Sequence, residues 1–167
     1  MSNPTYELLT ATFDKMLPAL KGLLATAEAD AAARKIDPEI FLTARLAPDM
    51  FAFTRQVQIT TDQVKGGMSR LAGTKVPAWA DDEMSFAELA ARVDKAIAHV
   101  ATFKPDDFAD ALGRKIELKF PNASFEFTGK DYLYGFVLPN FYFHMTAAYA
   151  ILRHNGVAVG KRNFLGG

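Results

Sequence analysis

The stretch from residue 128 to residue 156, TGKDYLYGFVLPNFYFHMTAAYAILRHNG, constrains the fold more than any other part of the chain. It predicts one long helix that begins with Thr128 as its cap and ends at the left-handed turn favoured by Asn155-Gly156. Pro139 interrupts the pattern, and we expect a bend there. At about 1.5 Å per residue the helix is roughly 40 Å long. Because it is apolar almost all round, several neighbouring elements must bury it.

Three further stretches repeat apolar residues at three- and four-residue steps, which is typical of amphipathic helices. The first begins at Asn3-Pro4 and ends before Asp37-Pro38, which opens a short helix of its own. The second is predicted to begin after Ala47-Pro48 and to end near Gly73, and the third to run from Ser85 to about Thr102. Ser85 and Glu88 form a capping box, for which we expect a hydrophobic staple between Met84 and Leu89. Gly66-Gly67, inside the second helix, indicates the close approach of a neighbouring helix in preference to a hinge.

Residues 115–120 and 125–127 alternate apolar and charged side chains, which predicts a β-hairpin. An isolated hairpin is marginally stable, so its apolar face is expected to lie on the helices. The glycine-rich tail after Gly156 is expected to form no further element and to lie against the surface or against a partner subunit. The sequence therefore predicts a mainly α protein: one four-helix-bundle domain over residues 1–167, with a small β-hairpin before the last helix.

The charge balance and the residue types missing from the chain exclude several classes of function. Nineteen basic and nineteen acidic residues cancel, whereas proteins that bind nucleic acid usually carry a basic excess. The absence of cysteine excludes disulfides, thiolate metal sites and cysteine nucleophiles. We see no signal peptide and no apolar run long enough to cross a bilayer, so we expect a cytoplasmic protein with no membrane partner. A neutral chain does little to oppose self-association, and we expect a homodimer.

His144 is the strongest candidate for chemistry, since it lies within the apolar last helix one turn after Asn140. Gln58 and Asp62 form a second one-turn pair on the second long helix, with Arg55 nearby. If these two helices are neighbours, the five side chains converge in the bundle core. The set then forms a structural hydrogen-bond network, a small-molecule pocket or a metal site, and buried polar groups need partners in all three cases.

The other two histidines are weaker candidates. His99 lies among small residues on the third helix and is interpreted as a partly exposed helix residue. His154 lies in the last turn of the final helix, where an imidazole interacts well with the terminal carbonyls. About 15 Å separates it from His144 along the axis, so the two cannot share a metal.

Three segments resemble a known family: LTARLAPDMF at 42–51, RQVQ at 55–58 and DYLYGFVLPNFYFHMTAAYAILRHNGV at 131–157. With ARKIDP before them and GKRNFLG after them, they are similar to an uncharacterised domain-of-unknown-function family of the DinB/YfiT-like superfamily. The resemblance implies a four-helix bundle that is often dimeric. Relatives in the superfamily include metal-dependent thiol S-transferases and maleylpyruvate isomerase, which hold a divalent metal with one histidine of the second helix and an H-x-x-x-H pair of the last.

Only His144 matches that metal motif, because Asn140 and Ala148 occupy the positions one turn away and the second helix has no histidine. We therefore expect no cofactor and no metal triad. The preferred hypothesis is a small-molecule-binding bundle with Arg55, Gln58, Asp62, Asn140 and His144 as its polar contacts. One alternative is an enzyme that uses Asp62 and His144 as a base and its orienting partner, with a weakly held divalent metal in one version. A further alternative is a structural, dimeric interaction protein. We expect the His144 imidazole to point inward, with a polar partner near Asp62 or Gln58.

Overall fold

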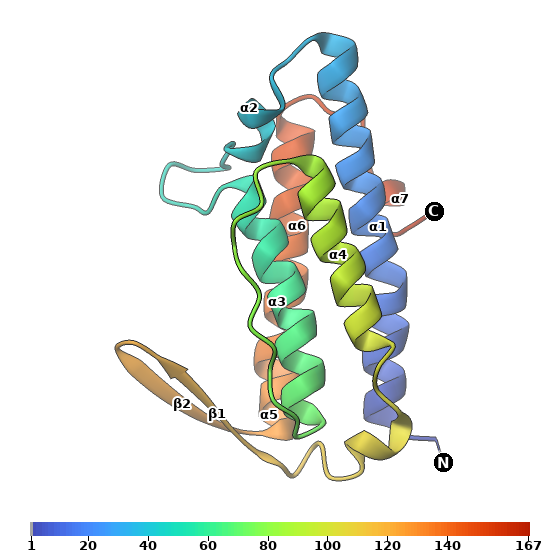
Figure 1. The fold of residues 1–167 in the computed structure, drawn as a ribbon, viewed down its shortest axis with the longest axis vertical. Helices are drawn as coiled ribbons and strands as arrows, with labels where there is room; N and C mark the ends of the chain where they lie inside the picture. Colours follow the sequence, from blue (N-terminus) through green and yellow to red (C-terminus); the bar gives the residue numbers. More distant parts are fainter. Residues whose placement is uncertain (1) are drawn as a thin grey trace.

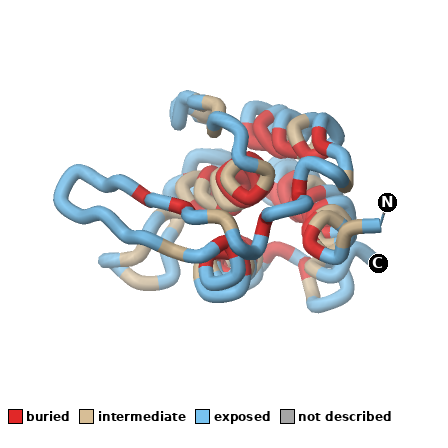
Figure 2. Tube along the Cα trace, turned by 90° about the horizontal axis from the view of Figure 1, so that it is seen from below, coloured by how far each residue is buried: buried red, intermediate tan, exposed pale blue. Residues whose placement is uncertain are grey.

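The computed structural model describes residues 2–167, which form a four-helix bundle with a β-hairpin projecting from one end (Figure 1). The four long elements are α1 (Pro4–Arg34), α3 (Phe53–Leu71), α4 (Phe86–Val100) and α6 (Leu138–His154). The shorter elements are α2 (Pro38–Leu42), the 3₁₀ turn η1 (Pro105–Phe108), β1 (Lys115–Phe120), β2 (Ala123–Thr128), α5 (Gly129–Tyr132), the π-helical turn η2 (Leu133–Val137) and α7 (Lys161–Phe164). Seen from the end, the buried residues lie where the helices face one another (Figure 2). Among residues 2–167, no helix is long and apolar enough to cross a membrane.

The first two helices begin where their caps predict. Asn3 Oδ1 accepts hydrogen bonds from the amides of Thr5 and Tyr6, and Asp37 caps α2 in the same way through the amide of Glu39. Lys35 ends α1 in the left-handed conformation, with φ of 53°. These local signals fix the two ends of α1 and the short α2 that follows it.

The second long helix begins later than predicted. The residues after Pro48 form turns, and α3 begins only at Phe53, whose amide donates to the carbonyl of Ala44. The guanidinium of Arg45 donates to the carbonyl of Met50 and holds this loop together. Phe51 lies in this loop and is exposed.

A long connection joins α3 to α4, and we call residues 74–84 the strap. It runs back along the outside of α3, so that α3 and α4 point in the same direction (Figure 1). Ser85 caps α4 as expected, but the Glu88 carboxylate reaches the amide of Met84. Met84 is 79% exposed, so the predicted hydrophobic staple is wrong.

The predicted final helix is a chain of three helical pieces. Just before Pro139 the ladder widens into the π turn η2, in which the amide of Leu138 donates to the carbonyl of Leu133. Because proline brings no amide proton, the regular ladder cannot continue through it unchanged, and the widened turn takes up the mismatch. Val137 of this turn packs on Gly67, where an added Cβ would lie 2.8 Å from the Val137 Cγ1. The close approach predicted at the glycine pair of α3 is confirmed.

The hairpin packs on the bundle only along its inner half. Ile116 and Leu118 are buried as expected, whereas Phe120 and Phe125 are each 50% exposed. Figure 2 shows the outer half of the hairpin extending away from the helices. The apolar face of the hairpin therefore lies on the helices, as expected, through Ile116 and Leu118 but not through Phe120 and Phe125.

The tail forms an element that the sequence did not predict. Val157 and Val159 are buried, and Lys161–Phe164 then form the one-turn helix α7, which packs on α1. The Phe164 ring lies 5.8 Å from that of Tyr149 on α6. The tail therefore covers the surface of its own chain.

Candidate functional site

The candidate site is organised by α3, which presents three different polar faces. Successive residues of a helix turn by about 100°, so positions two apart point to nearly opposite sides. One face is directed toward α4 and the strap, and carries Gln58, Thr61, Lys65 and Ser69. A second is directed toward α6 and carries Gln56 and Gly67. The third lines a surface hollow and carries Arg55, Ile59, Asp62, Gln63, Gly66 and Arg70.

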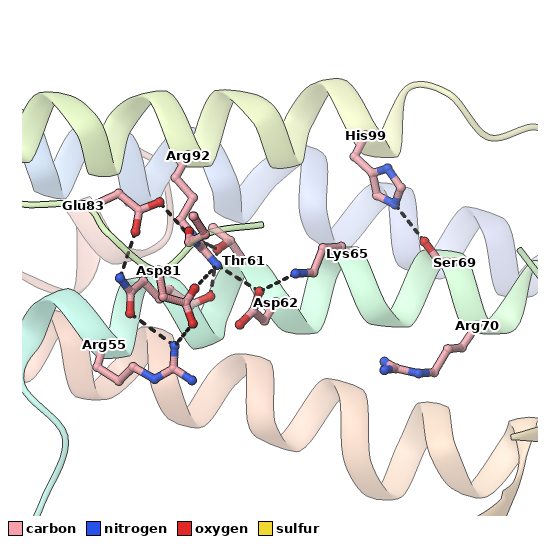
Figure 3. Close-up of polar contacts among 12 residues, drawn as sticks. Arg55, Thr61, Asp62, Lys65, Ser69, Arg70, Asp81, Glu83, Arg92 and His99 are labelled. Atoms are coloured by element: carbon pink, nitrogen blue, oxygen red, sulfur yellow. Dashed lines mark hydrogen bonds and ion pairs between the residues drawn. The ribbon is translucent and has the colours of Figure 1, made fainter. Parts of the chain in front are cut away.

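Arg92 of α4 is the buried centre of an ion network on the first of these faces (Figure 3). Its side chain is 2% exposed. It donates four hydrogen bonds, to Thr61 Oγ1 and the carbonyl of Ala80 at 2.8 Å each and to Glu83 and Asp62 at 2.9 Å each, and it forms an ion pair with Asp81 at 2.9 Å. Burial alone would lower the pKa of Arg92, but the hydrogen bond that Arg92 donates to Glu83 and the three carboxylate charges outweigh it and raise the pKa. The guanidinium therefore remains charged.

Two more cations complete the network. Arg55 donates to Asp81 at 2.6 Å and to the side-chain oxygen of Gln58 at 3.2 Å, and Lys65 pairs with Asp62 at 2.8 Å. Gln58 in turn donates to Glu83 at 2.8 Å. Three cations thus face three carboxylates, so the charges cancel. Gln58 and Asp62 belong to this network and not to the vicinity of His144.

Trp79, the only tryptophan, anchors the strap on the same face. Its ring lies under three cations, with Lys65 Nζ at 4.7 Å, Lys95 Nζ at 4.9 Å and Arg92 Cζ at 5.6 Å. His99 approaches it edge-on at 6.1 Å. Each cation–π contact contributes on the order of 0.5–2 kcal/mol, so the ring and the ion network fasten the strap together.

His99 is more engaged than its sequence neighbours suggest. Its Nε2 lies 2.9 Å from Ser69 Oγ of α3. Burial lowers the pKa of His99 below its usual value. The pair links α3 to α4 below the ion network, and His154 is exposed in the last turn of α6.

His144 points inward, as expected, and is 8% exposed. Its partner, however, is Gln56, whose Oε1 lies 2.7 Å from His144 Nδ1. Gln56 also donates to the carbonyl of Phe51 at 3.1 Å. Gln56 was not among the predicted site residues, although it belongs to the same RQVQ segment as Gln58. The one-turn spacing of Gln58 and Asp62 predicted a polar face of α3 that meets the ion network and not His144.

The surroundings of His144 disfavour the charged form of its imidazole. Burial and then the positive charge of Arg55 lower its pKa below the usual value. No side-chain nitrogen or oxygen among residues 2–167 is both buried and without a hydrogen-bond partner. His144 Nε2 has no protein partner, so it must be reached by solvent.

Asn140 makes no hydrogen bond with His144. Its side-chain amide donates to the carbonyl of Phe136 at 2.7 Å, in the π turn one turn earlier. Because Pro139 disturbs the backbone ladder here, the amide serves the backbone locally. The predicted convergence of Asn140 and His144 with Gln58 and Asp62 is therefore wrong, since three separate hydrogen-bond groups hold them.

Three of the predicted residues nevertheless share one hollow. A depression of about 490 Å³, which we call the α3 hollow, lies between α3, the strap, the hairpin and the start of α6. Its polar lining includes Arg55, Asp62 and Asn140, and its apolar lining comprises Ile59, Val76, Leu118, Phe120 and Phe136. A second hollow of about 650 Å³, between α2 and the strap, takes in Arg55 and Gln58.

Arg70, which the sequence analysis did not select, lies at the other end of the α3 hollow. It donates to the Tyr132 hydroxyl at 2.9 Å, and Figure 3 draws it apart from the ion network. Burial raises the pKa of Tyr132, although the charge of Arg70 and its hydrogen bond act in the opposite direction. Arg70 could have been found from the sequence, because it continues one face of α3 at three- and four-residue steps: Arg55, Ile59, Asp62, Gly66 and Arg70.

The donors near His144 do not suit a tightly bound divalent metal. Such sites need three or four converging ligands. Gln56 is engaged with the imidazole, Asn140 is turned to Phe136, and Ala148 has no donor. Across residues 2–167, no group of three or more histidine, cysteine, aspartate or glutamate side chains is arranged to hold a metal ion.

Comparison with known proteins finds a matching family and similar solved structures. The family described as a domain of unknown function, DUF1993, matches residues 5–165. The crystal structure of a DinB family member protein from Shewanella denitrificans is 40% identical in sequence. The alignment covers 97% of this chain and 92% of that one, with a TM-score of 0.88. No curated protein matches the chain.

Proposed function

This chain belongs to the DUF1993 family, with the fold of a DinB family protein, and on that premise we propose that it binds a small organic molecule in the α3 hollow. The observation that carries the proposal is the lining of that hollow. Arg55, Asp62 and Asn140 line it together with apolar side chains of four separate elements. Ligand sites are typically concave and mainly apolar, with a few polar groups that fix orientation.

Two amide side chains in the hollow have hydrogen-bonding capacity left for a ligand. Gln63 makes no hydrogen bond to the described residues, and Asn140 uses only its amide nitrogen, which leaves its oxygen able to accept. Arg55 already pairs with Asp81, and Asp62 already pairs with Lys65 and Arg92. Both would therefore orient a ligand mainly through their charge. Gln58 would position Arg55, and His144 would lie behind the hollow as support for α6.

Thermal-shift screening with a metabolite library tests the binding proposal. Ile59→Trp would fill the hollow, and Ala98→Trp would place the same ring on the exposed side of α4 as a control. We expect hits that stabilise the native protein and the Ala98→Trp variant but not the Ile59→Trp variant. If hits stabilise both variants equally, or if none is found, the α3 hollow is not the binding site.

We further propose that the metal triad of the superfamily relatives has been lost. The supporting observation is that Gln56 stands beside His144 where a second ligand would be needed. Elemental analysis of the purified protein, followed by addition of zinc, nickel or manganese, tests this. Stoichiometric metal, or stabilisation by any of the three ions, would contradict the loss.

A second candidate function is acid–base catalysis by His144. The accessible Nε2 and the lowered pKa describe a neutral base whose other nitrogen is held by Gln56. Gln56 would then be the orienting partner in place of Asp62, which is engaged with Arg92 and Lys65. The test is whether any screening hit is consumed, with a rate that follows the protonation of His144 and vanishes in His144→Gln.

A homodimer and a cytoplasmic location stay predictions, and we propose both. Exposed aromatic side chains on α6 and nearby loops, including Phe143, Tyr142 and Phe51, support self-association. If the interface were the whole purpose of the protein, it would be a structural interaction protein and the α3 hollow would bind nothing. Light scattering at micromolar concentrations tests the dimer, and a monomer there would refute it.

A further inference from the structure

We propose that the ligand of the α3 hollow is a small organic acid with an apolar body, whose carboxylate pairs with Arg70. This inference rests on the proposed binding function and names the class of ligand. It follows from the charges around the hollow, the position of the Arg70 guanidinium and the composition of the walls.

The charges around the hollow do not cancel once Arg70 is counted. Within the ion network, Arg55, Lys65 and Arg92 are balanced by three carboxylates, as described above. Arg70 lines the same hollow and has no carboxylate partner among residues 2–167. The hollow therefore carries one uncompensated positive charge at the end away from Arg55. A monoanion would neutralise it, whereas a dianion would meet the Asp62 carboxylate.

The Arg70 guanidinium is held in place and yet remains largely available. Its Nη1 donates to the Tyr132 hydroxyl at 2.9 Å, and its Cζ lies 5.9 Å from the centre of that ring. Gly66 makes room for it, because a Cβ there would lie 2.3 Å from Nη1. That hydrogen bond uses one of five N–H donors, and no buried donor lacks a partner, so the others reach the solvent side. A planar fork with free donors suits a carboxylate, which it binds with two parallel hydrogen bonds.

The walls of the hollow indicate what the rest of the ligand is. The hollow that Arg70 lines is also lined by two phenylalanines and three aliphatic side chains: Phe120, Phe136, Ile59, Val76 and Leu118. The Phe136 ring stacks on Tyr132 at 5.6 Å, with 15° between the planes, so the aromatic wall continues up to the residue that holds Arg70. A carboxylate attached to an aromatic or alkyl body would place its charge on Arg70 and its apolar part against this wall.

Calorimetric titration with benzoate and phenylacetate, and with their neutral analogues benzamide and phenylacetamide, tests the inference. We expect the acids to bind at least tenfold more tightly than the amides, since a hydrogen bond to a charged group is worth more than a neutral one. Arg70→Gln should remove that preference, and Arg70→Lys should restore part of it because the charge is kept but the fork is lost. Arg153→Gln, the same change on the exposed end of α6, should bind as the native protein does.

Gly66→Ala provides a second test if Arg70→Gln does not fold. It keeps the charge but displaces the guanidinium from Tyr132, so the acids should bind severalfold more weakly while the amides are unaffected. Equal binding of acids and amides, or acid binding that neither variant changes, would overturn the inference. If the acids do not bind but neutral compounds do, and Ile59→Trp blocks them, the inference fails and the binding function stands. If nothing binds in the hollow, both fail.

Discussion

Arg92→Met tests whether the ion network holds the strap against the bundle. The substitution keeps much of the apolar stem but removes the guanidinium of a side chain that is 2% exposed, together with its four hydrogen bonds and its ion pair with Asp81. In the variant, Asp81 still pairs with Arg55 and Asp62 still pairs with Lys65. Glu83 loses its cationic partner and retains only the hydrogen bond from the neutral amide of Gln58. The network then has one carboxylate too many, at a position where Glu83 is 11% exposed.

The expected loss is large because one partner of a buried pair is removed. Breaking such a pair costs about 3–5 kcal/mol, whereas replacing a whole buried network with apolar groups is often neutral. For a domain of this size each kcal/mol lowers the midpoint by roughly 2–4 °C, so we expect a decrease of about 6–20 °C. Adding Glu83→Gln should recover part of the loss, since the uncompensated charge disappears with it.

Urea unfolding followed by circular dichroism measures the stability, and the fluorescence of Trp79 reports on the strap. Because its ring lies 5.6 Å from Arg92 Cζ, we expect the emission of the native state of Arg92→Met to shift toward that of exposed tryptophan. Lys21→Met is the control: Lys21 of α1 pairs at 2.7 Å with Asp94 of α4, the helix that also carries Arg92, but both side chains of this pair are solvent-exposed. The control should change stability by less than about 1 kcal/mol. If Arg92→Met costs no more than the control and leaves the emission unchanged, the network does not hold the strap.

Two further predictions concern the helix contacts and the histidines. Gly67→Ala should destabilise the protein by about 1–3 kcal/mol, because the new Cβ would lie 2.8 Å from Val137 Cγ1. Gly22→Ala, in open space on α1, should instead stabilise it by about 0.5–1 kcal/mol. Thermal unfolding of both variants measures the contrast, and equal effects on stability would refute it. Burial lowers the pKa values of His144 and His99 below the unfolded value of about 6.5, so their contribution is complete above that pH and is lost as the pH falls below it. The free energy of unfolding should fall by up to about 1.4 kcal/mol per pH unit for each histidine, and a smaller slope in His144→Asn would assign that residue's share.

The helices, the hairpin and their caps could be predicted because local chemistry determines them. Asn3, Asp37 and Ser85 cap helices wherever the chain places them, since a short polar side chain meets free amides there. The start of α3 could not be predicted in the same way. Proline favours a helix start after Ala47, but hydrogen bonds from Phe53 to Ala44 and from Arg45 to Met50 stabilise a loop instead.

The candidate residues were individually well placed in the sequence but wrongly grouped. One-turn spacing showed that Gln58 and Asp62 share a face, but it could not show which neighbour that face meets. The answer depended on Arg92 and on the strap, which brings Asp81 and Glu83 back from a connection with no regular structure. Likewise, the π turn before Pro139 redirected Asn140 to Phe136. The periodicity of a single helix shows which side chains share a face, but it does not show which side chains of other elements they meet.

The Gln56–His144 contact yields a last prediction, in which metal binding is created and not removed. Oε1 of Gln56 lies 2.7 Å from His144 Nδ1, so a histidine at position 56 would bring a second imidazole beside the first. Asn140→His adds a third, one turn before His144 on α6. Three imidazoles suit zinc or nickel, and we expect the double variant Gln56→His/Asn140→His to bind either ion. At a metal concentration 100-fold above the dissociation constant, the ion should stabilise it by about 2.7 kcal/mol, measured as a rise in the unfolding midpoint. Gln58→His/Asn140→His is the matched control and should gain nothing, because position 58 is directed toward Glu83 of the strap. If the double variant folds but neither zinc nor nickel stabilises it, positions 56 and 144 are not arranged as two ligands of a metal site.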